Sequence, residues 1–502
     1  MEKWNKISLY SVLFLFVFFL SGCGNKQKKE FNRLLVELAD ADATIDAGDW
    51  KKITDYLDSH QAKWHEFYKD GQINADAVTE YISQFFSHRR PPKEIAFIGI
   101  GGKEYFTVNF YLERSGSMTP YDAPHGDGSF KAAIVQLLNN LPGNNDDNRI
   151  YVVNSSVNKY PQGFSKFISD PNIFESTKGL GDPSYTDFSK IFTDLLNKTG
   201  KNELSILVTD MIYSTKSMLG INPQKVFAEA QGMTNAVFKA QVKDKSMLII
   251  KMRGSYQGPY YSYNAPSTGK NYSGYRPYYI VIVGSNANMA RLSKDKNYAS
   301  FCHFSELRGY QNMYLFDTNG IYHPYYSLLL NDPKIRGRFH PEHGQGTQIT
   351  RIKDISPDEN SGDLRLALAV DLSGMFIDDH YLTDPSNYQI SSDDDLVIKE
   401  IKRISSRDVK PNERQYLGSA THLFILEMKQ VSHDQDVAIQ LVNRLPGWVQ
   451  SSSNDDDTNL SNGNFSNTTF GLKYLLQGIY DSYQKNSDGT PYYFKMDLKF
   501  SK

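Results

Sequence analysis

Cysteine is almost absent from this chain, which has only Cys23 and Cys302 among its 502 residues. A scaffold stapled by disulfide bonds is therefore excluded, and an exported domain has to rely on its hydrophobic core. An excess of one charge is also lacking, because the formal net charge is only −2. We therefore expect no nucleic-acid partner and no general affinity for polyanions. The length and the 40% hydrophobic content suffice for two or more domains.

The N-terminus has an apolar run, Val12 to Leu20, that is shorter than a membrane-spanning helix requires. Lys3 and Lys6 precede this run, and the sequence Leu20-Ser21-Gly22-Cys23 closes it. A basic start, a short apolar stretch and small residues are typical of a secretory signal.

The order Leu-Ser-Gly-Cys resembles the bacterial lipoprotein signal. The resemblance implies that residues 1–22 are removed and that Cys23 is lipidated, with palmitate among its acyl chains, so that the protein is anchored to the cell envelope. Gly24 and several basic residues follow the cysteine, which favours the outer membrane as the destination. A plain signal anchor is the alternative.

Residues 23–92 are predicted to form a polar tether and a helical stalk. The tether is the stretch 24–30, and three short amphipathic helices follow it at helical spacing. Pro91-Pro92 marks the end of this region. The stalk is interpreted either as a binding surface for a partner or as a spacer.

Between residues 93 and 330, apolar runs alternate with helical patterns. This alternation predicts an α/β domain with a doubly wound, mostly parallel sheet. Thr186 or Asp187 is expected to cap one helix and Asn222 another, while Asp127 or Ser129 caps an earlier one. The predicted strands are 95–100, 106–112, 150–153, 204–208, 247–251 and 279–283.

Polar side chains follow two of these predicted strands. The run 106–112 ends in Glu113-Arg114-Ser115-Gly116-Ser117, which puts a carboxylate and two hydroxyls at the carboxyl end of a strand. Open parallel sheets bind ligands at this edge. Thr186 lies in a loop before a predicted helix, and Asp210 closes the run that begins at Leu204. Oxygen ligands of this kind suit a hard cation such as Mg²⁺.

These residues resemble the von Willebrand factor A family, over about residues 93 to 330. The family has an Asp-x-Ser-x-Ser turn after its first strand, a Thr in a later loop and an Asp after its fourth strand, which form a metal-ion-dependent adhesion site. The resemblance implies that Ser115, Ser117 and Thr186 contact Mg²⁺, or Mn²⁺ or Ca²⁺ in its place. Glu113 and Asp210 would hold its waters or bind the ion themselves. An open position would then take a carboxylate from a partner protein.

Glu113 departs from the family pattern, which has Asp at this position. The longer side chain either displaces the metal or leaves the site empty. Arg114 offers another alternative, because a guanidinium turned inward would neutralise the carboxylates in place of a cation. For each residue alone, a hydrogen-bonded turn is the simpler interpretation. We expect no enzyme, because no nucleophile–base pair is evident.

The segment from Ser255 to Tyr279 is crowded with tyrosine, together with Ser, Gly and Asn. Such loops suit adaptable recognition of a glycan or a protein. The alternative is a twisted hairpin that packs its tyrosines on the edge of the domain.

Residues 331–502 are predicted to form a mainly-β, sandwich-like domain, interrupted by one helix that carries Phe470, Tyr474 and Ile479 on one side. The predicted strands are 364–370, 396–401, 422–428, 437–442 and 493–498.

Four polar motifs in this region are interpreted as structural. Val370 to Met375 echoes the serine turn but lacks its second Ser, so a strand-end turn is preferred. The runs Asp393–Asp395 and Asn454–Asp457 lack EF-hand spacing and are interpreted as solvated loops, with Ca²⁺ binding as the alternative. The segment His340 to His343 has the spacing of no zinc motif.

The sequence thus predicts a cell-envelope lipoprotein whose von Willebrand factor A-like domain binds another protein. Two alternatives stay open: an envelope metal-dependent hydrolase, and a structural envelope protein with a degenerate, metal-free site.

Overall fold

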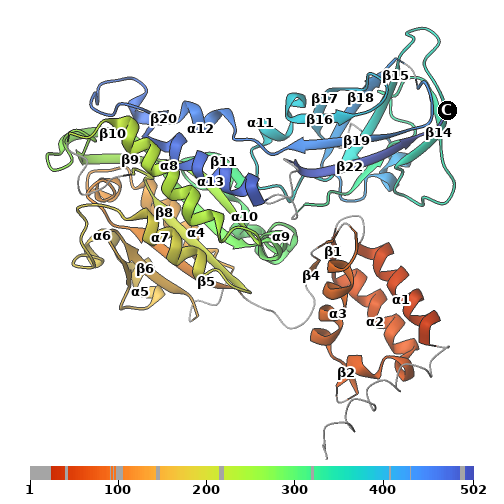
Figure 1. Ribbon diagram of the computed structural model, residues 1–502, viewed down its shortest axis with the longest axis horizontal. Helices are drawn as coiled ribbons and strands as arrows, with labels where there is room; N and C mark the ends of the chain where they lie inside the picture. Colours follow the sequence, from red (N-terminus) through yellow and green to blue (C-terminus); the bar gives the residue numbers. More distant parts are fainter. Residues whose placement is uncertain are drawn as a thin grey trace, which may run out of the picture. The chain divides into compact units, whose positions relative to one another are not determined.

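The computed structural model describes residues 24–39, 43–69, 71–90, 92–93, 95–97, 106–142, 147–213, 220–317, 322–405, 409–429, 431–486 and 492–502 (Figure 1). The chain divides into two compact units, Met1–Lys103 and Glu104–Lys502. No helix within the described ranges has the length and apolar content of a membrane span. The predicted signal run Val12–Leu20 and Cys23 lie outside these ranges.

The first unit is built on three α-helices in its described part: α1 (Gly24–Ala39), α2 (Ala47–Ser59) and α3 (Ala75–Ser87). The stretch 24–30, predicted as a tether, is instead the start of α1. Asp46 caps α2 and Asn74 caps α3, because their side chains accept backbone N–H groups of the first turn. The core is aromatic, and the Phe31 ring lies 4.9–6.3 Å from the rings of Tyr56, Trp64, Phe67 and Tyr81.

A short parallel ladder also belongs to this unit. In it, β4 (Ala96–Phe97) pairs with β1 (Thr44–Ile45). The strand predicted over 95–100 therefore does not join the central sheet through its described residues, and 98–100 lie outside the described ranges. The remaining short strands are β2 (Tyr68–Lys69) and β3 (Gln72–Ile73).

The second unit contains a mixed seven-stranded sheet in the order β11-β9-β10-β8-β5-β6-β7 (Figure 1). Its strands are β5 (Thr107–Glu113), β6 (Arg149–Val153), β7 (Val157–Lys159), β8 (Glu203–Thr209), β9 (Lys245–Tyr260), β10 (Lys270–Ser285) and β11 (Tyr310–Phe316). Strand β5 runs parallel to both β6 and β8, whereas every other pairing in this sheet is antiparallel. The predicted α/β class is confirmed. The parallel part is limited to three strands because β10 turns back between β8 and β9.

Helices connect these strands, and predicted capping residues hold the starts of two of them. Asp187 Oδ1 accepts Lys190 N at 3.2 Å, and Asn222 Oδ1 accepts Gln224 N at 2.9 Å. The prediction of Asp127 or Ser129 as the cap of the earlier helix is wrong, because its N-cap is Gly128, although Asp127 Oδ1 accepts Ser129 N at 2.8 Å. The helices are α4 (Ser129–Asn139), α5 (Phe164–Ser169), α6 (Ile173–Ser176), α7 (Phe188–Asn197), α8 (Pro223–Lys239), α9 (Asn286–Lys294) and α10 (Ala299–Cys302), with 3₁₀ turns η3 (Thr119–Asp122), η4 (Lys296–Tyr298) and η5 (Phe304–Glu306).

The tyrosine-rich segment is a long hairpin. Strands β9 and β10 pair without interruption from Lys245↔Ser285 to Tyr260↔Lys270. The two short strands predicted at 247–251 and 279–283 are its inner halves. Half of its eight tyrosines are packed inside: Tyr256, Tyr260, Tyr278 and Tyr279 are at most 1% exposed, while Tyr275 is 41% exposed.

The β-rich part contains two sheets. One has the order β12-β15-β18-β17 and the other β13-β14-β22-β19-β16. The sheets meet where the ring of Tyr388 lies 5.2 Å from that of Phe424. All pairs are antiparallel except β14 with β22, a departure from the predicted antiparallel sandwich. The elements are β12 (Tyr326–Leu328), β13 (Arg338–Pro341), β14 (Arg351–Ser356), β15 (Leu364–Val370), α11 (Asp379–Leu382), η6 (Pro385–Asn387), β16 (Tyr388–Ser391), β17 (Val397–Arg403), η7 (Pro411–Tyr416), β18 (His422–Met428), β19 (Gln435–Val442) and β22 (Tyr492–Phe500).

Between β19 and β22 the chain returns to the seven-stranded part. This return contains α12 (Gly447–Ser451), β20 (Ser453–Asn454), η8 (Phe465–Asn467), β21 (Thr469–Phe470) and α13 (Leu472–Asn486). Helix α13 lies beside α8, and Thr234 Oγ1 donates to Leu475 O at 3.0 Å (Figure 1). Strands β20 and β21 pair with each other and close a loop, called here the 453–470 loop. The predicted domain border at residue 330 is thus crossed by the chain more than once.

Candidate functional site

The predicted site residues lie at the carboxyl ends of β5 and β8, which are neighbouring parallel strands. The ladder pairs Leu112 with Val208, so Glu113 and Thr209 end the two strands side by side. From β5 the chain runs through α4 to β6 on one side, and it comes back later as β8 on the other side. Strand order therefore reverses at β5, which is where open α/β sheets bind ligands.

Glu113 is buried at this position, with 1% of its surface exposed. Thr186 Oγ1 donates a hydrogen bond to Glu113 Oε1 over 2.5 Å, and Thr209 Oγ1 donates one to Glu113 Oε2. Thr209 Oγ1 itself accepts Met211 N at 2.9 Å. Each carboxylate oxygen thus has a hydroxyl partner, one from the loop before α7 and one from β8.

The two serines lie between Glu113 and Asp210. Ser115 Oγ and Ser117 Oγ are 3.1 Å apart. Asp210 is 2% exposed, and its Oδ1 accepts Ile212 N at 3.0 Å. Asp210 Oδ2 is buried and has no hydrogen-bond partner among the described residues. The structure therefore brings together Glu113, Ser115, Ser117, Thr186 and Asp210, while their role as metal ligands stays a prediction.

The two buried carboxyl groups resist ionisation. Burial, and then the charge of Asp210, raise the pKa of Glu113 to about 8, although the hydroxyls of Thr186, Thr209 and Ser115 oppose this shift. Burial also raises the pKa of Asp210, against the hydrogen bonds of Ser117 and of Ile212 N and against the charge of Arg276. A pair of this kind gains strongly from a positive charge placed between its members.

Arg114 does not supply that charge. Its Nε donates to Phe174 O at 3.2 Å, so the guanidinium is held by the chain near α6. The buried cation that acts on Asp210 is Arg276 on β10, which is 2% exposed. Sequence reasoning missed Arg276. The available signal was one arginine inside the aromatic run Tyr275-Arg276-Pro277-Tyr278-Tyr279.

Two further residues at the site were also missed. One of them is Thr209, which directly precedes Asp210. It is the last residue of β8, so its hydroxyl could have been expected near the end of the neighbouring strand. Tyr261 lies past the end of β9, and its ring covers Gly116, the residue between the two serines. Nothing in the local sequence of Tyr261 indicates this contact, because it depends on the register of the hairpin.

The residues present fit a hard divalent cation. All candidate ligand atoms are oxygens, which Mg²⁺ prefers. The buried Oδ2 of Asp210 has no hydrogen-bond partner among the described residues, and a bound cation would supply one. Across the described ranges, no group of three or more His, Cys, Asp or Glu side chains is arranged to hold a metal. An ion at this site would therefore depend on the hydroxyls as well as on the two carboxylates.

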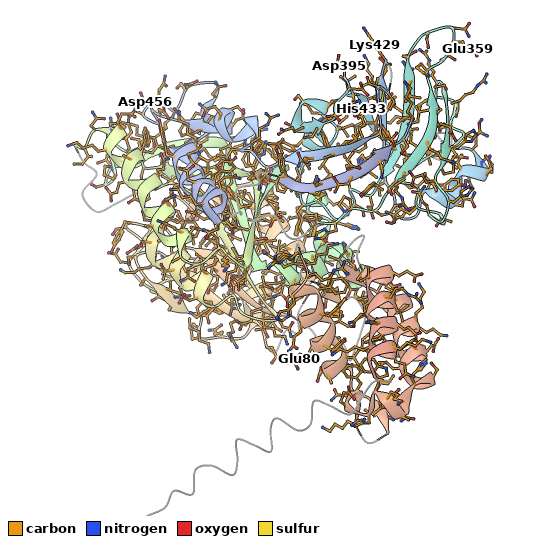
Figure 2. The ribbon with its side chains drawn as sticks, turned by 45° about the vertical axis from the view of Figure 1, so that its right-hand side comes forward. Glu80, Glu359, Asp395, Lys429, His433 and Asp456 are labelled. Carbon is orange, nitrogen blue, oxygen red and sulfur yellow. The ribbon has the colours of Figure 1, made fainter. Side chains whose placement is uncertain are left out.

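The other polar motifs are engaged in structural contacts. Asp371 Oδ1 accepts both Ser373 N and Ser373 Oγ, which closes a strand-end turn, as preferred from the sequence. His433 Nε2 lies 2.9 Å from Asp393 Oδ2, and His433 and Asp395 are at the surface of the β-rich part (Figure 2). The interpretation of 454–457 as a solvated loop is wrong for Asp457. This residue is 2% exposed, and its carboxylate accepts the hydroxyl of Tyr260 on the hairpin.

Comparison with known proteins found no matching family model, no matching curated protein and no matching solved structure.

Proposed function

We propose that this chain is a lipid-anchored cell-envelope protein that binds a partner protein through a divalent cation held at the carboxyl edge of a von Willebrand factor A-like sheet. The observation that carries the proposal is the convergence of three distant segments. Glu113 ends β5 and the serine pair follows it, Thr186 precedes α7, and Asp210 follows β8. Glu113, Ser115, Thr186 and Asp210 are buried at the switch point of the sheet, with Ser117 partly exposed beside them.

In this proposal Ser115, Ser117 and Thr186 contact the ion, and Glu113 and Asp210 neutralise it. A bound cation supplies an open coordination position that attracts an anionic oxygen, in particular a carboxylate of the partner. Ser117 is the ligand that is partly exposed, so the partner approaches on its side. The extra methylene of Glu113 is accommodated, because the hydroxyls of Thr186 and Thr209 hold its carboxylate.

Calorimetry with Mg²⁺ and with Mn²⁺ tests the site. We expect binding by the wild-type protein and its loss in Ser115→Ala and Asp210→Ala. Ser373→Ala is the matched control, since Ser373 lies in a similar turn of the β-rich part and should leave affinity unchanged. Capture of envelope proteins should weaken in the presence of a chelator. Binding that survives both site substitutions contradicts the proposal.

The lipid anchor is tested separately by substituting Cys23. Cys23→Ala should abolish labelling with palmitate and release the protein from the membrane fraction. Labelling that persists in this variant contradicts the anchor but leaves the cation site untouched.

A metal-free structural role is the second candidate, and two observations favour it. Both oxygens of Glu113 already have hydroxyl partners, and Arg276 supplies a buried positive charge that acts on Asp210. This candidate gains if neither ion binds and partner capture is intact in Ser115→Ala and Asp210→Ala.

A further inference from the structure

The 453–470 loop binds the outer end of the β9–β10 hairpin. Asp457 Oδ2 accepts the hydroxyl of Tyr260 at 2.7 Å, and its Oδ1 accepts Tyr263 N at 3.1 Å. The ring of Tyr263 stacks on that of Phe470 at 5.1 Å. The exposed neighbour Asp456 lies at the periphery of the same segment (Figure 2). The loop therefore holds the hairpin end through one buried carboxylate and a ring stack.

Arg276 is the second attachment of this loop. Its Nη1 donates to Phe465 O at 2.5 Å, and its guanidinium lies 4.0 Å from the ring of Phe465 and 4.7 Å from that of Tyr260. Such stacking stabilises a desolvated guanidinium. Arg276 Nε is buried and has no hydrogen-bond partner in the described part of the chain. Among the described residues, the charge of Arg276 is thus stacked and held by one carbonyl, without a carboxylate in direct contact.

The same arginine lies close to the candidate cation site. The antiparallel ladder of β8 and β10 ends at the pair of Thr209 with Tyr279. Asp210 directly follows Thr209, and Arg276 is three residues before Tyr279 on β10. Both side chains are buried, and the charge of each acts on the other through space.

We propose that Arg276 and a bound divalent cation are alternative counter-charges for Asp210, so that cation binding weakens the attachment of the 453–470 loop. The inference rests on the proposed function, since it adds a positioning residue to the same site. A cation beside Asp210 takes over its negative charge and repels the Arg276 guanidinium. Because Arg276 holds Phe465 O, this repulsion acts on the loop. By linkage, a change that frees the loop without altering the charge around Arg276 raises cation affinity to the same extent.

Two substitutions should move Mg²⁺ affinity in opposite directions, which general damage to the fold would not do. Arg276→Met removes the competing charge, and we expect about tenfold tighter Mg²⁺ binding. Asp457→Asn removes a carboxylate charge that interacts with Arg276 but leaves an amide oxygen for the loop's hydrogen bonds, and we expect several-fold weaker binding. Arg276→Lys keeps the charge but loses the stacking on Tyr260 and Phe465, and it should bind Mg²⁺ more weakly than Arg276→Met does. Lys251→Met is the matched control, since it removes a second buried cation, which lies on β9 and binds Ser452, and it should leave the Mg²⁺ affinity unchanged.

Unchanged or weaker Mg²⁺ binding in Arg276→Met overturns the inference. If that variant does not fold, Asp457→Asn decides alone, and unchanged or tighter binding in it is the contrary result. In the wild-type protein, the amide of Tyr263 should exchange hydrogen faster after Mg²⁺ is added, because its bond to Asp457 loosens. Slower exchange contradicts the proposed coupling.

A measurement without metal separates this inference from the proposed function. In chelator, the effects of Arg276→Met and Asp210→Asn on the unfolding equilibrium should not simply combine in the double variant. We expect a deviation from additivity of roughly tenfold in the equilibrium constant. Additivity overturns the role of Arg276 as a counter-charge. A wild-type chain that binds neither Mg²⁺ nor Mn²⁺ overturns the proposed function and with it the exchange. A chain that binds Mg²⁺ with the same affinity in all variants overturns only the inference.

Discussion

The ring of Tyr261 lies directly against Gly116, where an added Cβ would come within 3.0 Å of Tyr261 Cε2. Glycine is needed there because of this close approach. The backbone conformation does not require it, since the φ angle of Gly116 is not positive. The hairpin end therefore forms one side of the candidate site, beside both serines.

Gly116→Ala should destabilise the protein by about 1 kcal/mol, because Tyr261 must shift to admit the methyl group. Gly232→Ala is the opposite case, since Gly232 is inside α8 with nothing within 4 Å of its built Cβ. That change should stabilise by about 0.5–1 kcal/mol. Urea unfolding of both variants checks the pair, and equal effects would contradict the contact.

Gly478→Ala should be far more costly. An added Cβ would lie 2.1 Å from Thr234 Oγ1 and 2.2 Å from Gln231 O, so α13 would have to move away from α8. We expect a loss of about 3 kcal/mol or more in urea unfolding. Gly463→Ala, with open space around its Cβ, should leave the stability nearly unchanged. A loss below about 1 kcal/mol for Gly478→Ala would count against the close packing of these helices.

Thr209→Val should destabilise by about 1–3 kcal/mol, because it leaves Glu113 Oε2 and Met211 N without their partner while the shape is kept. Thr54→Val removes a hydroxyl that bonds Lys51 O on an exposed helix surface, and its effect should stay below about 0.5 kcal/mol. Thermal unfolding of the two variants compares these costs. Similar losses in both would mean that the Thr209 hydroxyl has no special role.

The stability of the metal-free protein should fall as pH rises from about 5 to about 8. The pKa of Glu113 is raised from 4.5 to about 8, so the folded state holds a proton that the unfolded state has already released. The dependence contributed by one proton is at most about 1.4 kcal/mol per pH unit. Denaturant titrations in chelator at several pH values measure it, and Glu113→Gln should flatten the curve. With Mg²⁺ present, affinity should instead rise with pH over this range, because the ion needs the ionised carboxylate.

Lys251 should produce the opposite slope at higher pH. Burial, and then the charge of Arg253, lower the pKa of Lys251 from 10.5 to about 8. Above pH 8 the unfolded state therefore binds more protons than the folded one, and stability should increase towards pH 10. Lys251→Met should remove this increase in denaturant titrations between pH 8 and pH 10. If stability depends on pH in the same way in the variant, the lysine is solvated in the folded state and does not cause the increase.

The central strands followed from short-range signals, and the five predicted site residues from these signals together with the family resemblance. Apolar runs predict β5 and β8, and parallel strands expose their carboxyl ends at one edge, so Glu113 and Asp210 were expected to be neighbours. Asp187 and Asn222 marked helix starts because capping depends on residues within one turn.

What the sequence did not reveal depends on register and on partners far along the chain. Ser, Gly and Pro in the outer hairpin have the composition of a loop, so the full length of β9 and β10 was missed, and with it the places of Tyr261 and Arg276. The apolar side of α13 indicated burial, but the pattern does not say that α8 covers it. The mixed sheet follows from the same hairpin, since β10 inserts between β8 and β9.

The return of the chain from the β-rich part has a consequence for biosynthesis. All seven strands of the mixed sheet leave the ribosome before the residues that cover α8 are made. Phe227 and Phe238 therefore have no ring partners until Tyr474 and Tyr483 have been synthesised. A nascent chain stopped before α13 would present this uncovered apolar helix to its surroundings. Shortened gene products ending near residue 330 should therefore aggregate, and a holding chaperone should favour such intermediates over the finished protein.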